Sequence, residues 1–314
     1  MSVCSLAAQT TFTTFDPPSS RQTIPLSIND SGSVTGYYSD GSATHGFLRA
    51  PDGSFIVLDA PGATATFGWS INDDGLIAGY FFASNKSHGF VRTADGTFIT
   101  YDPVGSTDTT PESINSGGAV TGYYSDASGD VHGYLRASDA TITTFDPPGS
   151  TSTRPMCVNS AGQITGYYLD SAQLDHGFVR SSDGTISTFL VGKGQNTQPA
   201  SINAAGKVTG TYGTLNNPYA FLREADGTIT TFAPEHSTST SPYSINDAGA
   251  ITGFYIDSQG GSYGFVRHPD GTIAIFGAPN VNFIFPFSMN SGGEITGYYQ
   301  TSVFTTSHGF LFSE

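Results

Sequence analysis

Positive charge is the scarcest feature of this sequence. Its 314 residues include 11 Lys and Arg against 26 Asp and Glu, so the formal net charge is −15. Sequence-independent binding to nucleic acid or to anionic membranes depends on clustered cations, so we expect neither as a partner. Long apolar runs are missing too. None approaches the stretch of about 18 residues that a membrane-spanning helix needs, and we expect no membrane insertion.

Cysteines and the common catalytic motifs are also nearly absent. The two cysteines, Cys4 and Cys157, allow one disulfide at most, which is no disulfide framework. The sequence contains no phosphate-binding Gly-rich loop, no zinc-ligand cluster and no nucleophile elbow. We therefore expect neither a cofactor nor a metal.

The N-terminal segment carries an incomplete export signature. Residues 3–8 are apolar, and Ala7-Ala8-Gln9 resembles a signal-peptidase site, but the apolar stretch is too short for a normal signal peptide. We interpret residues 1–9 as a tail and, alternatively, as the remnant of a signal. Residues 10–314 are predicted to form a single domain.

Glycine, proline and aromatic residues are plentiful, and they recur with a fixed period. The chain has 39 Gly, 17 Pro and 13% aromatic residues, which is typical of short strands joined by tight turns. The tripeptide Ser-Ile-Asn or a close variant occurs seven times, spaced by 43 or 44 residues, and its asparagines are Asn29, Asn72, Asn115, Asn159, Asn203, Asn246 and Asn290. Seven copies occupy nearly the whole chain and leave no linker.

Each copy has the pattern of four short strands. An Asn-x-x-Gly turn follows the first apolar segment, and a β-branched and aromatic segment such as residues 34–38 comes next. A variable loop, a segment such as residues 45–49, a tight turn such as Asp95-Gly96 and a last segment such as residues 141–145 complete the copy. Seven four-stranded units without helices predict an all-β, seven-bladed β-propeller of antiparallel blades. A β-helix has much shorter coils.

The two ends of the chain complement each other. The last copy stops after its third strand, and residues 11–16 at the N-terminus match the fourth-strand pattern of residues 141–146. We predict that this N-terminal strand completes the last blade and closes the ring, which removes two open sheet edges.

The third segment of the copies carries a family resemblance. It contains His-Gly-Phe or a close variant in five copies, beginning at His45, His88, His132, His176 and His308, while two copies begin with Tyr219 and Tyr263. From about Thr11 onward the chain resembles the HAF-type extracellular repeat family, which is named for a His-Ala-Phe tripeptide. The resemblance implies an exported bacterial protein, extracellular or periplasmic, and assigns no chemistry.

Residues that occur in every copy are interpreted as structural. The five histidines are spread around a ring and cannot meet on one metal ion, so each is expected to hydrogen-bond a neighbouring strand or blade. Six arginines end the third segments, each three residues before an aspartate, which predicts a local ion pair or a capped turn. The loop aspartates Asp40, Asp126, Asp170 and Asp257 are interpreted as solvated loop residues rather than calcium ligands.

The functional signal lies where the copies differ. The residue before each Ser-Ile-Asn serine, expected near the mouth of the central channel, has no common character: Leu26, Trp69, Glu112, Met156, Ala200, Tyr243 and Phe287. Two positions earlier the residues are Ile24, Phe67, Thr110, Arg154, Gln198, Ser241 and Phe285. These two columns predict one site with an aromatic wall and a polar pair, Glu112 and Arg154. The alternative is that these side chains merely plug the channel.

Three functions fit this site. We favour an exported, monomeric binding protein that takes a small, partly apolar ligand at the channel mouth. The alternative is a cofactor-independent lyase, isomerase or cyclase with Glu112 as acid or base, Arg154 as anion stabiliser and His236 from another blade connection as a further catalytic candidate. The aromatic residues, Met156 and Gln198 would hold the substrate. A lectin with one carbohydrate site per blade is the repeat-symmetric alternative.

Overall fold

The computed structural model describes residues 11–214, 216–278, 281, 283–301 and 306–314. These residues form 28 β-strands and no helix, so the fold is all-β as predicted. Within this part of the chain, no helix is long and apolar enough to cross a membrane. The predicted tail at residues 1–9, with Cys4, lies outside the described residues.

The strands follow the sequence repeats, with four positions in each repeat. The first strands are β2 (Gln22–Ile28), β6 (Ala65–Ile71), β10 (Ser106–Ile114), β14 (Ser150–Val158), β18 (Asn196–Ile202), β22 (Ser237–Ile245) and β26 (Phe283–Met289). The second strands are β3 (Val34–Ser39), β7 (Ile77–Ala83), β11 (Val120–Asp126), β15 (Ile164–Asp170), β19 (Val208–Thr214), β23 (Ile251–Asp257) and β27 (Ile295–Gln300). The third strands are β4 (Thr44–Arg49), β8 (Lys86–Arg92), β12 (Val131–Arg136), β16 (Asp175–Arg180), β20 (Asn217–Arg223), β24 (Ser262–Arg267) and β28 (Ser307–Ser313). The fourth strands are β5 (Phe55–Leu58), β9 (Phe98–Tyr101), β13 (Ile142–Phe145), β17 (Ile186–Phe189), β21 (Ile229–Phe232), β25 (Ile273–Phe276) and β1 (Thr11–Phe15).

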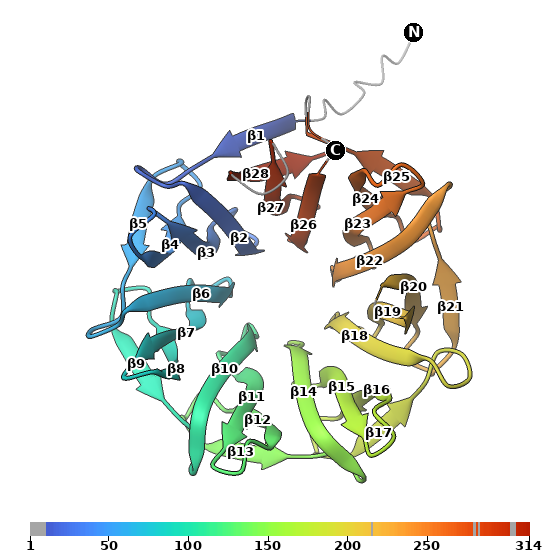
Figure 1. Cartoon of the computed structure of the whole chain (residues 1–314), viewed down its shortest axis with the longest axis horizontal. Helices are drawn as coiled ribbons and strands as arrows, with labels where there is room; N and C mark the ends of the chain where they lie inside the picture. Colours follow the sequence, from blue (N-terminus) through green and yellow to red (C-terminus); the bar gives the residue numbers. More distant parts are fainter. Residues whose placement is uncertain (1–10, 215, 279–280, 282, 302–305) are drawn as a thin grey trace, which may run out of the picture.

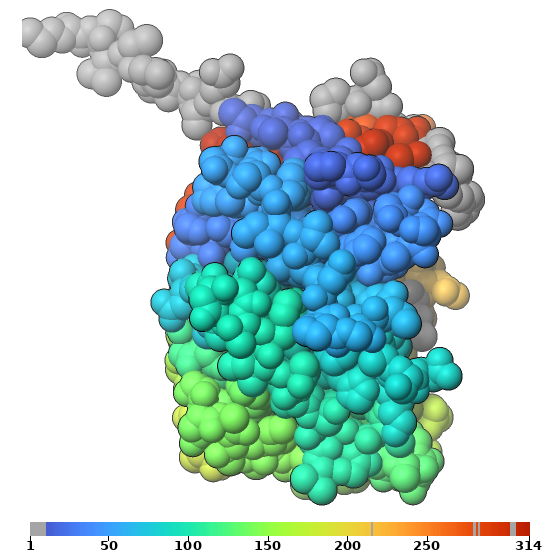
Figure 2. All heavy atoms as spheres, turned by 90° about the vertical axis from the view of Figure 1, so that its left-hand side faces the viewer, coloured from blue at the N-terminus to red at the C-terminus, as the bar shows by residue number. Residues whose placement is uncertain are grey.

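Successive strands of a repeat pair antiparallel, and the repeats are arranged radially with their first strands nearest the centre (Figure 1). Single parallel bridges, such as Gln22 with Ser307, join some neighbouring repeats. Main-chain pairing therefore divides the strands into sheets of 16, 8 and 4 rather than one continuous ring. Along the outer rim, consecutive repeats follow one another from the blue to the green part of the chain (Figure 2).

The N-terminal strand β1 pairs antiparallel with β28, the third strand of the last repeat, over Thr11–Phe15. It takes the place of the fourth strand that the last repeat lacks, at the top of Figure 1. Phe12 stacks on Phe310, with ring centroids 5.1 Å apart, and Phe15 lies buried against Phe47 of β4. The first and last segments of the chain thus share one hydrophobic core.

The core lies between the repeats. Each third strand carries one fully buried aromatic residue: Phe47, Phe90, Tyr134, Phe178, Phe221, Phe265 or Phe310. Six of these seven residues contact the fourth-strand aromatic residue of the preceding repeat, as Phe178 contacts Phe145. The ring centroids of these six pairs are 5.9 to 6.4 Å apart. One repeat cannot bury both faces of its sheet, and these contacts show how neighbours cover them.

A cycle of hydrogen bonds connects the seven repeat asparagines. The side-chain Nδ2 of Asn29 donates to the carbonyl oxygen of Asn72, and the pattern continues through every repeat. Nδ2 of Asn290 then donates to the carbonyl of Asn29 at 3.2 Å, which completes the cycle. Each Oδ1 accepts a hydrogen bond from the backbone N–H four residues ahead, as Asn29 Oδ1 does from Ser33, so the predicted turn cap is confirmed.

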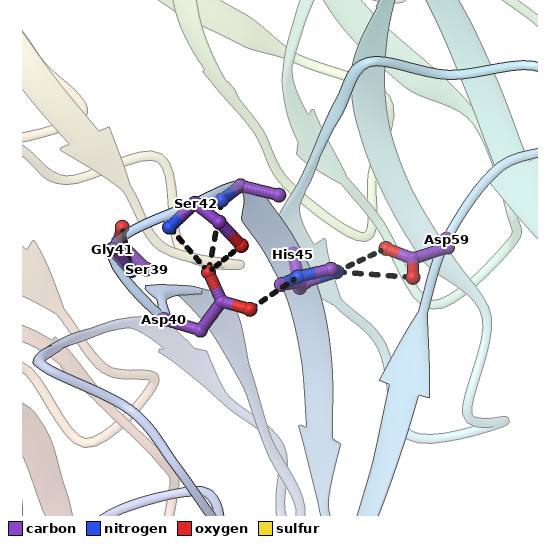
Figure 3. A network of polar contacts seen from close by, with 7 residues as sticks. Ser39, Asp40, Gly41, Ser42, His45 and Asp59 are labelled. Carbon is purple, nitrogen blue, oxygen red and sulfur yellow. Dashed lines mark hydrogen bonds and ion pairs between the residues drawn. The ribbon is translucent and has the colours of Figure 1, made fainter.

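Four of the five repeat histidines contact the end of the adjacent fourth strand in their own repeat, so the predicted contact is to a neighbouring strand rather than to a neighbouring blade. His45, His88, His132 and His308 each contact, through Nδ1, an aspartate just after a fourth strand. In Figure 3, His45 lies between Asp59 and Asp40. Hydrogen bonds from Ala43 and Ser42 hold the pKa of Asp40 well below its usual range, so its carboxylate caps its own loop.

His176 departs from this pattern, because Leu190 occupies the position where the other four histidine-bearing repeats have the aspartate; its Nε2 contacts Asp170 instead. The described residues contain no group of three or more His, Cys, Asp or Glu that could hold a metal ion.

Five of the six third-strand arginines stack on aromatic rings. The guanidinium of Arg49 lies 5.0 Å from the ring centroid of Phe15 in the preceding repeat and donates to the carbonyl of Ala50. Asp52 accepts the N–H of Ser54 and so caps the turn. Of the two predicted alternatives, the capped turn is present, and the arginine's main contact is a cation–π interaction with the neighbouring repeat.

Removing β1 is expected to destabilise the whole domain. Deleting residues 1–16 takes away the partner strand of β28, the Phe12–Phe310 stack and the buried Phe15, whose loss alone costs about 3–5 kcal/mol. We expect aggregation or loss of cooperative unfolding in thermal melts followed by circular dichroism. Deleting residues 1–10 leaves β1 intact and is the control. A long truncation that melts like the full chain would show that β1 does not close the ring.

Candidate functional site

A cavity of about 660 Å³ lies among the inner strands of the repeats. This volume falls within the range of about 300–1,000 Å³ that small-molecule sites occupy. All seven members of the variable column before the Ser-Ile-Asn serine line it: Leu26, Trp69, Glu112, Met156, Ala200, Tyr243 and Phe287. The cavity is open space rather than a channel filled by these side chains.

A bulge in each first strand accounts for this convergence. The pairing of β10 with β11 shifts between Pro111 and Ser113, which leaves Glu112 outside the ladder, and the other first strands shift at the same place. A bulged residue changes its direction relative to the sheet. The facing second strand has a glycine, because a Cβ on Gly122 would come within 2.1 Å of the Thr110 carbonyl oxygen.

Six of the ten predicted site residues line the cavity: Trp69, Glu112, Met156, Gln198, Tyr243 and Phe287. Three others pack behind the wall. Phe67 stacks on Tyr80 at 4.7 Å, and Phe285 stacks on Tyr298 at 4.8 Å. The guanidinium of Arg154 lies 4.6 Å from the ring centroid of Tyr123. These residues support the cavity wall and are absent from its lining.

His236 lies apart from the cavity lining. It is exposed, has a positive φ of 64° and occupies the turn just before β22. Seven residues of extended strand, about 23 Å, separate it along the chain from Tyr243, which does line the cavity. Its position in a blade connection therefore does not bring it to the channel mouth.

Sequence reasoning missed the second-strand contribution to the wall. Tyr37, Tyr167 and Tyr298 each follow the second-strand glycine and line the cavity, together with Thr211 at the same position of β19. The signal was present, since this position is Tyr in five repeats and Thr211 or Phe254 in the other two. A tyrosine that recurs in most repeats looks like a purely structural residue when only the sequence is considered.

Glu112 is the unusual group of the site. Trp69 donates its indole N–H to the Glu112 carboxyl at 2.8 Å. Burial raises the pKa of Glu112 to about 8, and the Trp69 hydrogen bond and the Arg154 charge lower it by less. Glu112 as a residue is half-buried, and it is part of the cavity lining. At neutral pH the group is therefore a neutral acid, able to donate a proton into the cavity.

The radial strand arrangement around a central cavity defines a β-propeller, and solved structures agree with this class. No known family model matches the sequence, and no curated protein matches it either. Among solved structures, a streptogramin B lyase aligns with a TM-score of 0.64 at 13% identity, covering 97% of this chain and 98% of the lyase. A catalytically inactive virginiamycin B lyase from Staphylococcus aureus, solved with quinupristin, aligns with a TM-score of 0.65 at 15% identity, covering 98% and 100%. TolB from Acinetobacter baumannii aligns with a TM-score of 0.54 at 13% identity, over 81% of this chain and 62% of TolB. At identities this low, the TM-scores show a common fold and nothing more.

Glu112 is expected to titrate near pH 8. Its side-chain carbon is one of five glutamate signals in a ¹³C-labelled sample, and Glu112→Gln identifies it by removing it. In Trp69→Phe the midpoint should rise further, because the N–H donor that lowers the pKa is lost. A midpoint near the ordinary 4.5 would contradict the burial of this carboxyl.

The same shift gives stability a pH dependence. Between 4.5 and about 8 the folded protein keeps a proton on Glu112 that the unfolded chain has released, so the free energy of unfolding should fall as pH rises through this window. Denaturant melts of Glu112→Gln should show a shallower fall than the unchanged protein. Parallel curves for the two proteins would count against the raised pKa.

Proposed function

We propose that this protein is a closed seven-bladed β-propeller that binds a small, partly apolar molecule in its central cavity. One observation carries the proposal: the open cavity of about 660 Å³ is lined by residues that differ from repeat to repeat. The fold itself accepts Leu26, Met156 or Ala200 at the position of Trp69, so the fold alone does not require a tryptophan there. Aromatic residues and a few polar groups around one concavity are typical of ligand sites.

The wall combines apolar and polar parts. The rings of Tyr243 and Phe287 meet edge to face with their centroids 5.0 Å apart. The ring centroids of Trp69 and Tyr80 are 5.7 Å apart. Tyr243 is partly exposed, at 39%, although it lies in the cavity wall. A ring or chain of hydrocarbon would cover these faces, while Glu112 and Gln198 offer polar contacts. The lectin alternative is less supported, because equivalent sugar sites in each repeat need equivalent residues.

Trp69 provides a direct test of binding. It is the only tryptophan of the chain, so its fluorescence reports on the cavity alone. In a titration with a set of aromatic compounds that each carry one polar group, we expect saturable changes with micromolar to millimolar Kd. Phe287→Ala should weaken binding about tenfold or more by removing a stacking surface. The matched control is Val104→Ala, which removes methyl groups from a fully exposed residue outside the cavity lining. The absence of any saturable change would contradict a cavity that binds small molecules.

A lyase is the second candidate. The support is the neutral Glu112 acid in the cavity, together with structural similarity to two proteins named as streptogramin B and virginiamycin B lyases. Glu112 would donate its proton to a leaving oxygen or accept one as the carboxylate above its pKa. Arg154 stacks on Tyr123 and is absent from the cavity lining, so in this mechanism its charge would act at a distance rather than by direct contact. Export, as the HAF-type motif implies, and a monomeric state remain part of the proposal.

Quinupristin is a suitable first probe of lyase activity. Mass spectrometry separates the outcomes, because elimination products together keep the mass of the substrate and hydrolysis adds one water. If the protein is a lyase for this compound, Glu112→Gln should lose about 10²–10⁴-fold in rate. Glu294→Gln, which changes a glutamate outside the cavity lining, should keep full activity. No turnover by the unchanged protein would rule out this substrate and leave the binding function standing.

A further inference from the structure

The cavity wall lacks large side chains at one place, the fifth repeat. The second-strand position that carries Tyr or Phe in six repeats is Thr211 in β19, and the bulge position of β18 is Ala200. Because both side chains are small, the cavity extends over β18–β20 and also reaches Gly213 and Pro218. We call this extension, bounded by Asn196, Gln198, Ala200, Thr211, Gly213 and Pro218, the β18–β20 recess.

Two side-chain amides in the recess are oriented by one buried residue. Nε2 of Gln198 donates to the Asp175 carboxylate at 2.6 Å, and the backbone N–H of Asp175 donates to Oδ1 of Asn196 at 3.1 Å. Asp175 is only 8% exposed. Since a carboxylate accepts and a backbone N–H donates, both amide orientations are determined.

These contacts leave the Oε1 acceptor of Gln198 and the Nδ2 donor group of Asn196 for a ligand. Oε1 of Gln198 and Nδ2 of Asn196 have no hydrogen-bond partner among the described residues, and neither is sealed in the interior. Both side chains line the cavity. Residues two apart on a strand share one face at a spacing of about 7 Å, which leaves room for a single amide group between them.

The Asp175–Gln198 pair occurs only between the fourth and fifth repeats. The position of Gln198 is taken elsewhere by Ile24, Phe67, Thr110, Arg154, Ser241 and Phe285, and the position of Asp175 by Thr44, Ser87, Val131, Pro218, Ser262 and Ser307. No other repeat combines a carboxylate with an amide at these two positions. The blade structure therefore does not require the Asp175–Gln198 pair.

We propose that the β18–β20 recess binds an amide group of the ligand, whose N–H donates to Gln198 and whose carbonyl accepts from Asn196. The rest of the ligand would lie against Trp69, Tyr243 and Phe287, so the ligand class is an amide that carries an aromatic or aliphatic group. Asp175 is a positioning residue. This inference rests on the binding function proposed above and names its ligand class.

A matched pair of probes tests the inference. N-benzylacetamide and benzyl acetate have the same shape, but the ester lacks the N–H donor and leaves the Gln198 oxygen unpaired. In NMR titrations the amide should bind about tenfold or more tightly than the ester. Gln198→Met should reduce this preference to less than threefold without weakening the ester. Asn196→Leu removes the donor to the carbonyl that both probes carry, so it should weaken both probes and leave the preference unchanged. Thermal melts verify that each variant is folded.

Gln22→Leu is the matched control, because Gln22 holds the place of Asn196 in the first repeat, is exposed and is absent from the cavity lining. It should keep the affinity for both probes and the full preference for the amide. Equal affinity of the two probes for the unchanged protein would overturn the amide inference and leave the binding function intact. If neither probe binds, the proposed binding function fails as well.

Discussion

Seven asparagine side chains hold the inner ends of the first strands together, and the rest of the structure depends on this cycle. Each Nδ2 reaches the main-chain carbonyl of the next asparagine at 2.9 to 3.2 Å, and Asn290 returns to Asn29. All seven asparagines are buried, so losing one of these hydrogen bonds without replacement would leave polar groups unpaired, at a cost of about 1–3 kcal/mol for each group. Main-chain bridges leave three separate sheets, and the asparagine cycle continues across the breaks. The bulge residue lies three positions before each asparagine, so the same cycle positions the cavity wall.

Local chemistry made most of the fold predictable. A period of 43 or 44 residues, turn glycines and alternating strands indicated the four strands of each repeat and the role of β1. Contacts between repeats were harder to predict. Asn29 was fully explained as a turn cap, so nothing in the sequence called for its second hydrogen bond to the next repeat. For Arg49 a nearby aspartate suggested an ion pair, whereas the ring that it covers belongs to a segment 34 residues earlier in the chain.

The candidate site was predictable to the extent that it breaks the repeat. The variable column before each Ser-Ile-Asn serine reached the cavity in all seven repeats, because every first strand has the same bulge. The column two positions earlier divided. Ile24, Gln198 and Ser241 line the cavity, while Phe67 and Arg154 pack against the second-strand rings of Tyr80 and Tyr123 and are absent from its lining. Contacts with the neighbouring strand thus contribute to which variable residues reach the cavity, and a single-strand pattern cannot reveal these contacts.

The Trp69–Glu112 pair is hard to explain by stability. Six other residue types occupy the bulge position in this chain, so the fold does not require a carboxyl there. A buried carboxyl that ionised would pay a large desolvation penalty, and one indole N–H at 2.8 Å offsets only part of it, which is why the pKa rises to about 8. Keeping the proton avoids that penalty but leaves an O–H group that needs an acceptor. Leu, Met or Ala at this position would need no hydrogen-bond acceptor. A neutral acid that reaches an open cavity and lacks a structural reason is best explained by a molecule that accepts its hydrogen bond or its proton.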